Sequence, residues 1–172
     1  MEVCARETAS EVAPTSAPAP GPAVLWRQTR IRLTTLHATE FIDITDRLQA
    51  FIDTAPIRVG FINLQTLHTT TAIIVNEHEP LLLADFETTL EHAAPARRAY
   101  WHDDATFRTV NVTPGERING HSHCRALLLG ASACLNIAGG RLLLGRWQRV
   151  FFAELDGPRE REMSAVIAGE AL

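Results

Sequence analysis

The fold class is decided by the stretch Val59-Gly-Phe-Ile-Asn-Leu-Gln-Thr-Leu-His-Thr-Thr-Thr-Ala-Ile-Ile-Val-Asn76. Two runs rich in isoleucine, valine and threonine, Val59–Leu67 and Thr71–Asn76, flank a short polar break. Residues of these types are favoured in β-strands, and runs of this length are typical of strands that pack in a core. The stretch therefore predicts two buried, consecutive β-strands.

Outside this stretch, further strands and a few helices are expected. Strands are predicted over Leu25–Thr35, Glu40–Ile44, Ala133–Ile137, Arg141–Leu144 and Val150–Leu155, with Met163–Ala168 as an edge strand. Helices are predicted over Asp46–Asp53, with Thr45 as N-cap, and between Pro80 and Pro95; a third, shorter apolar segment is Ala126–Leu129, with Gly130 as C-cap. Because the helices do not alternate regularly with the strands, we expect an α+β domain of mostly antiparallel, sandwich-like sheet with two or three helices.

Length and composition limit the classes of protein. The chain has 172 residues, enough for one domain, which we place at residues 23–172 after a Pro/Ala-rich disordered leader at residues 1–22. All 16 basic residues are arginine and the net charge is −4, so a lysine Schiff base is excluded and nucleic-acid binding is not expected. No apolar run is long enough to cross a membrane. Three cysteines without a CxxC pair indicate reduced thiols and a cytoplasmic location.

The first polar cluster is His68-Thr69-Thr70-Thr71, between the two central strands. It is either the donor-rich edge of a pocket or a threonine-rich edge strand with a solvated histidine. Asn76 and Glu77 follow at the end of the second strand, where a rigid element can direct polar groups into a site. Asp85, on the helix after Pro80, either serves a site or is an ordinary exposed helix acid.

Histidine pairs give the sharpest local signal. The chain has seven histidines, and His121 and His123 flank a single serine. If this segment is extended, the two rings share one side and can hold a metal ion; if it is helical, they point about 200° apart and only one belongs to the site. His102 lies in a segment that also carries two aromatic residues and two acids.

Two features near the C-terminus indicate charged side chains that bind a partner of opposite charge. Glu154 is embedded in an apolar strand and needs an arginine or a metal as partner. Asp156-Gly157-Pro158-Arg159 is a turn that presents an arginine fork to a phosphate or a carboxylate. The alternative is a purely structural Glu–Arg pair.

Together these motifs resemble the YjbQ-type family, whose members are described as secondary thiamine-phosphate synthases. The resemblance runs from about Val24 to Ala168, and several blocks occur in family order: His68-Thr-Thr, Ile74-Val-Asn-Glu77, Asp85, Tyr100 with His102, Asn119 through Ala126, Leu144-Gly-Arg-Trp-Gln148 and Glu154-Leu-Asp-Gly-Pro-Arg159. It implies a homotrimer with a polar pocket at or near the subunit interface. The family pattern carries over onto His68, Glu77, Asp85, His102, His123, Trp147, Gln148, Glu154 and Arg159.

The reaction implied by the resemblance joins a pyrimidine-methyl diphosphate to a thiazole phosphate. His68, Glu77, Asp85, His123 and Glu154 would be catalytic, and the phosphorylated substrate would contact Thr69, Thr70, Asn76, Arg125, Trp147, Gln148 and Arg159. A divalent metal, Mg²⁺ or Zn²⁺, is also expected. Relatives usually have lysine in place of Arg125, which cannot act as a base. They often have a small or acidic residue in place of His121, so His123 is the stronger candidate.

Two alternatives remain open on the sequence. One is a metal-dependent hydrolase or lyase in which His68, His102 and His123 bind a transition metal and polarise a water molecule. The other is a trimeric ligand-binding protein without enzymatic activity.

Overall fold

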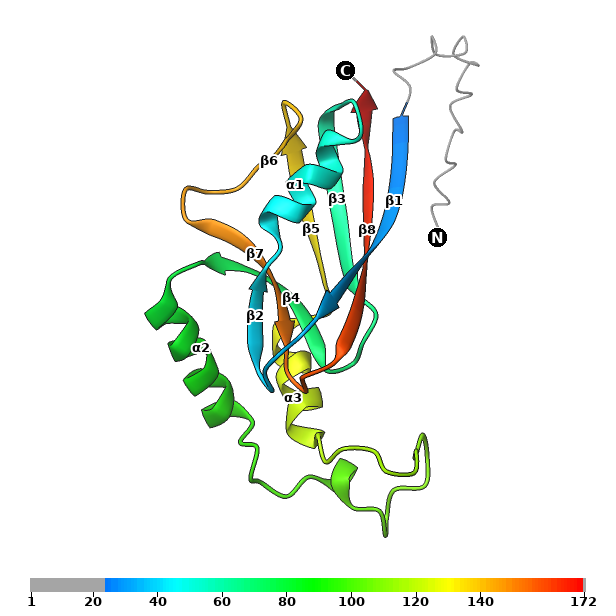
Figure 1. Cartoon of the computed structure of the whole chain (residues 1–172), viewed down its shortest axis with the longest axis vertical. Coiled ribbons are helices and arrows are strands. Elements are labelled where there is room, and N and C mark those ends of the chain that lie inside the picture. Colours follow the sequence, from blue (N-terminus) through cyan, green and yellow to red (C-terminus); the bar gives the residue numbers. More distant parts are fainter. Residues whose placement is uncertain (1–23, 172) are drawn as a thin grey trace, which may run out of the picture.

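The computed structural model describes residues 24–171, and two antiparallel sheets form the body of the fold (Figure 1). The larger sheet contains, in spatial order, β1 (Val24–Thr34), β8 (Glu160–Ala171), β3 (Ile57–Thr66), β5 (Ser132–Ala138) and β6 (Arg141–Leu142). The smaller sheet contains β2 (Glu40–Asp43), β7 (Gln148–Glu154) and β4 (Thr71–Glu77). The leader predicted for residues 1–22 lies outside the described residues.

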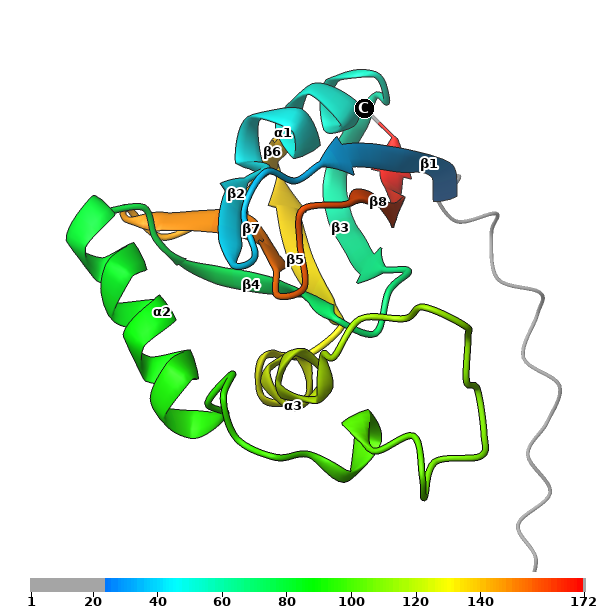
Figure 2. The same cartoon turned by 60° about the horizontal axis from the view of Figure 1, so that its bottom comes forward.

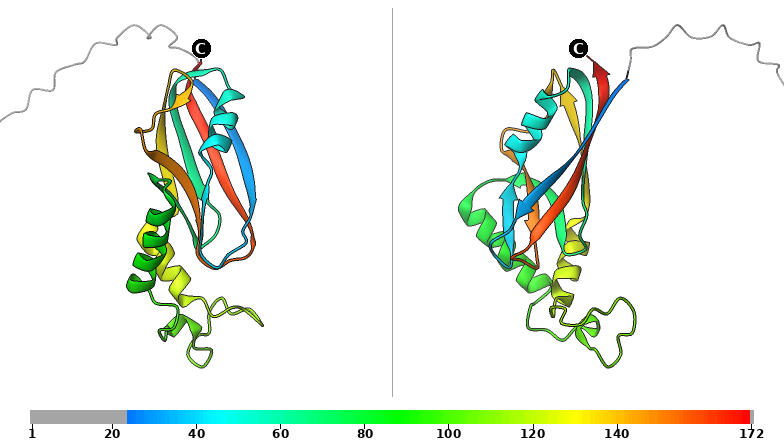
Figure 3. Two further views of the ribbon diagram at one scale, coloured as in Figure 1. Left: turned by 60° about the vertical axis from the view of Figure 1, so that its left-hand side comes forward. Right: turned by 45° about the vertical axis from the view of Figure 1, so that its right-hand side comes forward.

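The two sheets face each other, and α1 (Thr45–Asp53) extends the layer of the smaller sheet (Figure 3). The core between them is built from one face of each element and includes the fully buried side chains of Leu48, Ile62, Phe152 and Ile167. Each of these comes from a different helix or strand. Burial of such large apolar side chains, at about 25 cal/mol per Å², is the main force that holds the layers together.

Two further helices lie at the end of the smaller sheet. The helix α2 (Pro80–Ala93) is capped at its N-terminus by Glu79, whose carboxylate accepts the backbone N–H groups of Leu81 and Leu82. The helix α3 (Gly120–Leu129) ends at Gly130, which has a φ of 93°. Residues 95–119, with the short 3₁₀ helix η1 (Trp101–Asp103), loop between α2 and α3 and project beyond the sheets (Figure 2).

The structure confirms the predicted fold class, an α+β domain of antiparallel sheets in a sandwich-like arrangement. It differs at Met163–Ala168, predicted as an edge strand. This segment is part of the 12-residue β8, which lies between β1 and β3 and pairs with both. Thr45 is the first residue of α1 and makes no side-chain cap; its hydroxyl instead accepts the backbone N–H of Val150 at 2.8 Å, which ties α1 to β7.

Within residues 24–171, no helix is long and apolar enough to cross a membrane. The cytoplasmic location was inferred from cysteine usage alone and stays a prediction.

Candidate functional site

The N-terminus of α3 is held against η1 by Asp103. Its Oδ1 atom accepts the backbone N–H groups of Asn119 and Gly120 at 3.0 and 2.9 Å, and thereby satisfies two donors at the helix start. Gly120 is needed for this approach because a Cβ there would lie 2.5 Å from the Cβ of Tyr100. The contact fixes the position of the histidines on α3 relative to those on the projecting segment.

His121 and His123 lie on α3, so the helical alternative holds and their rings point to different sides. The ring of His123 packs against His102, with ring centroids 4.5 Å apart, whereas His121 lies 6.4 Å from the ring of Tyr100. We call His102 and His123 the histidine pair. They come from segments about twenty residues apart, and α3 and η1 bring them together.

The surroundings of His123 favour the neutral form of its imidazole at pH 7. Burial lowers the pKa of its imidazole, and the neighbouring His102 lowers it further, against the opposing charges of Asp156 and Asp103. A neutral imidazole carries a lone pair on one ring nitrogen and can accept a proton. The histidine pair can therefore take one proton and return it, which is the basis of general acid–base catalysis.

His121 has a different environment, beside Ser122 of its own helix and Tyr100 of the projecting segment. Its Nε2 lies 3.1 Å from the hydroxyl of Ser122, which itself donates to the carbonyl oxygen of Leu155. The hydroxyl proton is thus committed, so Nε2 donates and Nδ1 is the unprotonated nitrogen. That Nδ1 is buried and has no hydrogen-bond partner within the described residues. Burial and the charge of Arg125 lower the pKa of His121.

Two arginines, Arg117 and Arg159, belong to a polar network centred on Asp156. The Asp156 carboxylate accepts the side-chain amide of Asn119 at 2.8 Å and pairs with Arg159 at 2.7 Å. Arg117 donates to the carbonyl oxygens of Asp156 and Gly157 at 2.9 and 3.1 Å. A guanidinium has five N–H donors, and these contacts leave some of them free on each arginine.

Two clefts adjoin this network. One, of about 330 Å³, is lined by His102, Arg108 and Arg117 among other residues. The second, of about 500 Å³, is lined by Arg117, Asn119 and Arg159 together with the loop from Thr113 to Glu116. We call the second the arginine cleft. Because Arg117 lines both, an anion bound there would lie next to the histidine pair.

Glu154 forms the buried ion pair of the fold. Its carboxylate has no solvent exposure and is bound by two Arg161 nitrogens, each at 2.6 Å. The Thr35 hydroxyl and the N–H groups of Leu155 and Asp156 complete its hydrogen bonds. Burial raises the pKa of Glu154, but these hydrogen bonds, led by those from Arg161, outweigh burial and keep the pKa below its ordinary value. The structural reading of Glu154 holds, and no group is left free for catalysis.

His68 belongs to the surroundings of this ion pair rather than to the histidine pair. Its Nε2 accepts the backbone N–H of Glu162 at 2.8 Å, and burial together with the charge of Arg161 lowers its pKa. Thr70 accepts an Arg161 N–H at 3.0 Å, whereas Thr69 is exposed. The predicted set of His68, His102 and His123 is therefore not assembled: between residues 24 and 171, no three histidine, cysteine or acidic side chains are grouped to hold a metal ion. A metal at the histidine pair would need a further ligand from outside the described chain or from water.

Arg125 is also committed to the fold. It is buried on α3, donates to the carbonyl oxygen of Ala94 at 3.0 Å and pairs with Glu91 on α2. A third contact reaches the hydroxyl of Thr39 at 3.4 Å. The prediction that Arg125 clamps a phosphate does not agree with these contacts, which tie α3 to the end of α2.

The remaining predicted residues lie at the far end of the smaller sheet. Glu77 pairs with Gln148 in the register of β4 and β7, while Glu154 pairs with Thr71 at the other end. At about 3.3 Å per residue, the six steps between these pairs span about 20 Å. Asp85 is exposed on α2, and Trp147 is 61% exposed. One chain thus keeps two groups of predicted residues apart.

The site also contains residues that sequence reasoning did not select. Asp103, Asn119 and Arg117 have roles here that depend on contacts with distant segments. Asn119 and Asp103 stood within motifs that drew attention for their histidines. Arg117 lies in a loop with no motif, and nothing in the sequence distinguishes it from the other arginines.

Comparison with known proteins finds relatives of this chain in one family. The family described as "UPF0047 protein YjbQ-like" matches residues 29–170. A UPF0047 protein of Methanothermobacter thermautotrophicus is 38% identical over 138 residues, or 80% of this chain and 89% of its own length. The UPF0047 protein YjbQ of Salmonella typhimurium is 32% identical over 74% of this chain and 85% of its own.

Solved structures agree with this result. A YbjQ-like protein of unknown function from Sulfolobus solfataricus superposes with a TM-score of 0.77 at 31% identity, over 86% of this chain and all of that one. A protein of the same family from Clostridium acetobutylicum gives 0.71 at 31% identity, over 81% and 98% of the two chains.

These comparisons correct the expected activity. The matching family and its relatives are described as UPF0047 proteins, and the Sulfolobus protein is described as being of unknown function. None of them is described as a thiamine-phosphate synthase. The prediction of a transferase that joins a pyrimidine diphosphate to a thiazole phosphate is therefore wrong.

Proposed function

The chain belongs to the UPF0047 family of YjbQ-like proteins, and we propose that its histidine pair and arginine cleft together bind a small anionic molecule, on which His123 acts as a general base. One observation carries this proposal. Two imidazoles from separate segments lie 4.5 Å apart, and one of them, His102, lines a cleft together with Arg108 and Arg117, while the half-buried His123 has a lowered pKa. Perturbed titratable groups beside a cleft are common at functional sites.

The chemistry follows from the positions of the charges. His123 accepts a proton from the bound molecule or from water, and the imidazolium that forms is stabilised by the carboxylates of Asp156 and Asp103. An anion held at Arg117 and Arg159 adds negative charge beside the histidine pair and favours the same protonated state. Arginine forks match phosphate and carboxylate oxygens, so these are the ligand groups we propose.

A homotrimer is part of this proposal. The segment that carries His102 exposes large apolar side chains: Trp101 is 79% exposed, Phe107 70% and Ile118 75%. Apolar groups clustered on a projecting segment favour burial against another copy of the chain. Light scattering should then give about three times the 19.0 kDa chain mass, whereas a monomer mass would contradict the assembly.

Replacement of Arg159 by lysine tests the anion site. Lysine keeps the charge but loses the planar fork that now reaches Asp156 and lines the arginine cleft, so the affinity for inorganic phosphate should fall several-fold. Isothermal titration calorimetry measures this change. Arg58→Lys is the matched control, because Arg58 pairs with Glu170 on the exposed sheet. Equal affinities in Arg159→Lys and wild type would show that Arg159 serves only the fold.

A further inference from the structure

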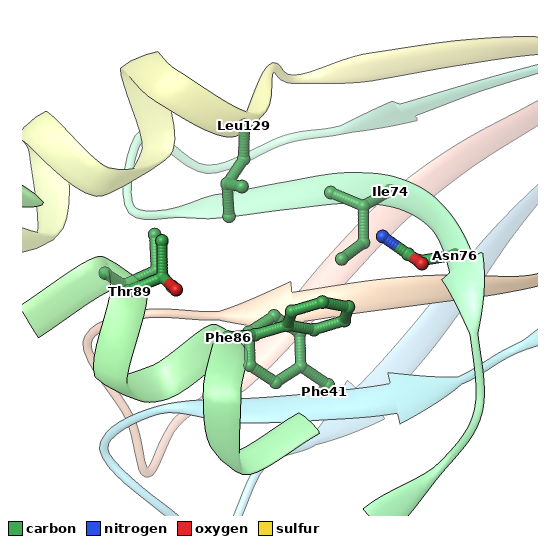
Figure 4. A pocket seen from close by; sticks show the side chains of 7 residues that line it. Phe41, Ile74, Asn76, Phe86, Thr89 and Leu129 are labelled. Carbon is green, nitrogen blue, oxygen red and sulfur yellow. The ribbon is translucent and has the colours of Figure 1, made fainter. Parts of the chain in front are cut away.

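A third pocket, separate from the two clefts described above, lies between α2 and the smaller sheet (Figure 4). Its volume is about 160 Å³, and its lining residues come from β2, β4, α2 and α3. None of these residues belongs to the histidine pair or to the arginine cleft. The pocket is therefore independent of the function proposed above.

The walls of this pocket are apolar and carry no ionisable side chain. Phe41 and Phe86 meet edge to face, with ring centroids 5.6 Å apart, and form one wall. Ile74 and Leu129 lie opposite, as Figure 4 shows. Transfer of a charged group into such surroundings would be unfavourable because no lining residue can compensate the charge.

Two polar groups face the pocket and would orient a ligand bound in it. The Oδ1 atom of Asn76 accepts the backbone N–H of Glu77 at 2.9 Å, and this bond fixes the orientation of the amide. The Nδ2 atom therefore points the other way, toward the pocket in Figure 4, where the hydroxyl of Thr89 also faces inward. Neither Nδ2 nor the Thr89 hydroxyl forms a hydrogen bond within residues 24–171. The pocket offers an amide donor to a ligand.

We propose that this pocket binds a small, uncharged ring compound that carries one hydrogen-bond acceptor. A cavity of about 150 Å³ lined by leucine, isoleucine and phenylalanine binds benzene, so a single ring suits this volume. The aromatic wall favours a ring because edge-to-face contacts add to the burial of apolar surface. The Asn76 amide selects an acceptor, such as a carbonyl oxygen or a ring nitrogen, at the mouth of the pocket.

NMR titration of the full chain with acetophenone tests this proposal. Acetophenone is an uncharged ring with one carbonyl acceptor, and it should shift the signals of the Asn76 side-chain amide, Thr89 and Leu129 in a saturable way. Toluene, which lacks the acceptor, should bind about two- to tenfold more weakly. Benzoate, which is charged, should cause no saturable shift. Equal affinities for all three compounds would overturn the proposed selectivity.

A pair of variants on α2 distinguishes this pocket from other sites. Thr89→Phe places a ring in the pocket and should abolish the acetophenone shifts. Thr88→Phe adds the same ring at a neighbouring exposed position that does not line the pocket, and should bind acetophenone like the wild type. Unchanged binding by Thr89→Phe would overturn the assignment. The wild type could also fail to bind acetophenone while Thr89→Phe forms a smaller assembly. This result would show that a second copy of the chain fills the pocket, and it would overturn the proposed ligand site.

Discussion

Replacement of Glu154 by alanine should lower the free energy of unfolding by about 3–5 kcal/mol, the largest effect we expect on stability. The substitution leaves the buried Arg161 guanidinium without its carboxylate and the N–H of Asp156 without its acceptor, while the N–H of Leu155 keeps only the carbonyl oxygen of Thr70. Urea unfolding at pH 7, followed by tryptophan fluorescence at fixed protein concentration, measures the loss. Glu160→Ala is the control, because Glu160 is exposed at the start of β8.

A double variant separates the ion pair from the other bonds of Glu154. If Arg161 and Glu154 are both replaced by methionine, neither charge is left buried alone. The loss in free energy of unfolding should therefore be smaller than the sum of the losses for the two single methionine variants. Losses that simply add would contradict the pairing. A loss below about 1 kcal/mol for Glu154→Ala would show that this ion pair does not hold the fold.

The same pair predicts how stability depends on pH. The pKa of Glu154 is lower in the folded protein than its ordinary value of 4.5. The stabilisation of the folded state by ionised Glu154 is therefore fully present when the pH is above that ordinary value. It is lost as the pH falls through the lowered pKa. The difference in stability between wild type and Glu154→Ala should narrow with acidification in this window.

Replacement of His123 by glutamine should lower turnover by about 10²- to 10⁴-fold, the range typical for loss of a general acid–base group. Glutamine keeps a similar size but cannot take up a proton. A panel of phosphorylated and carboxylated small molecules, followed by mass spectrometry, identifies a converted compound, and the same compound then gives the rate for each variant.

Two other histidines serve as controls for His123. His121→Gln should reduce turnover far less, since the His121 ring contacts Ser122 rather than His102. His92→Gln should leave turnover unchanged, because His92 is exposed on α2. Equal losses in His121→Gln and His123→Gln would contradict the role that we assign to His123.

The strands were predictable because the types and the order of side chains that favour a strand can be recognised in the local sequence. The pattern around Val59–Asn76 predicted β3 and β4 to within a few residues. β8 was predicted too short because Glu160, Arg161 and Glu162 resemble a charged turn. In the structure Arg161 is buried with Glu154, and Glu162 approaches Arg30 on β1. Contacts across the sheet thus override the local charge pattern.

The site was less predictable because it depends on contacts between distant segments. The sequence singled out His123 and His102, but it left the helical and extended alternatives for His121 and His123 open. The cap that fixes the start of α3 comes from Asp103, which lies 17 residues before Gly120. Arg125 was expected at a phosphate, but its partners on α2 are not evident from its neighbours in sequence. Residue type alone therefore identified candidates, while packing decided which of them meet.

The most direct test of the account is an NMR titration of the histidine ring signals with and without inorganic phosphate. We predict that the pKa of His123 lies below its ordinary value of 6.5 and rises when phosphate binds. The ring signals of His92, which is exposed on α2, should not move when phosphate is added. A pKa of His123 at or above 6.5 without phosphate, or one that does not respond to phosphate, would contradict an anion site beside the histidine pair.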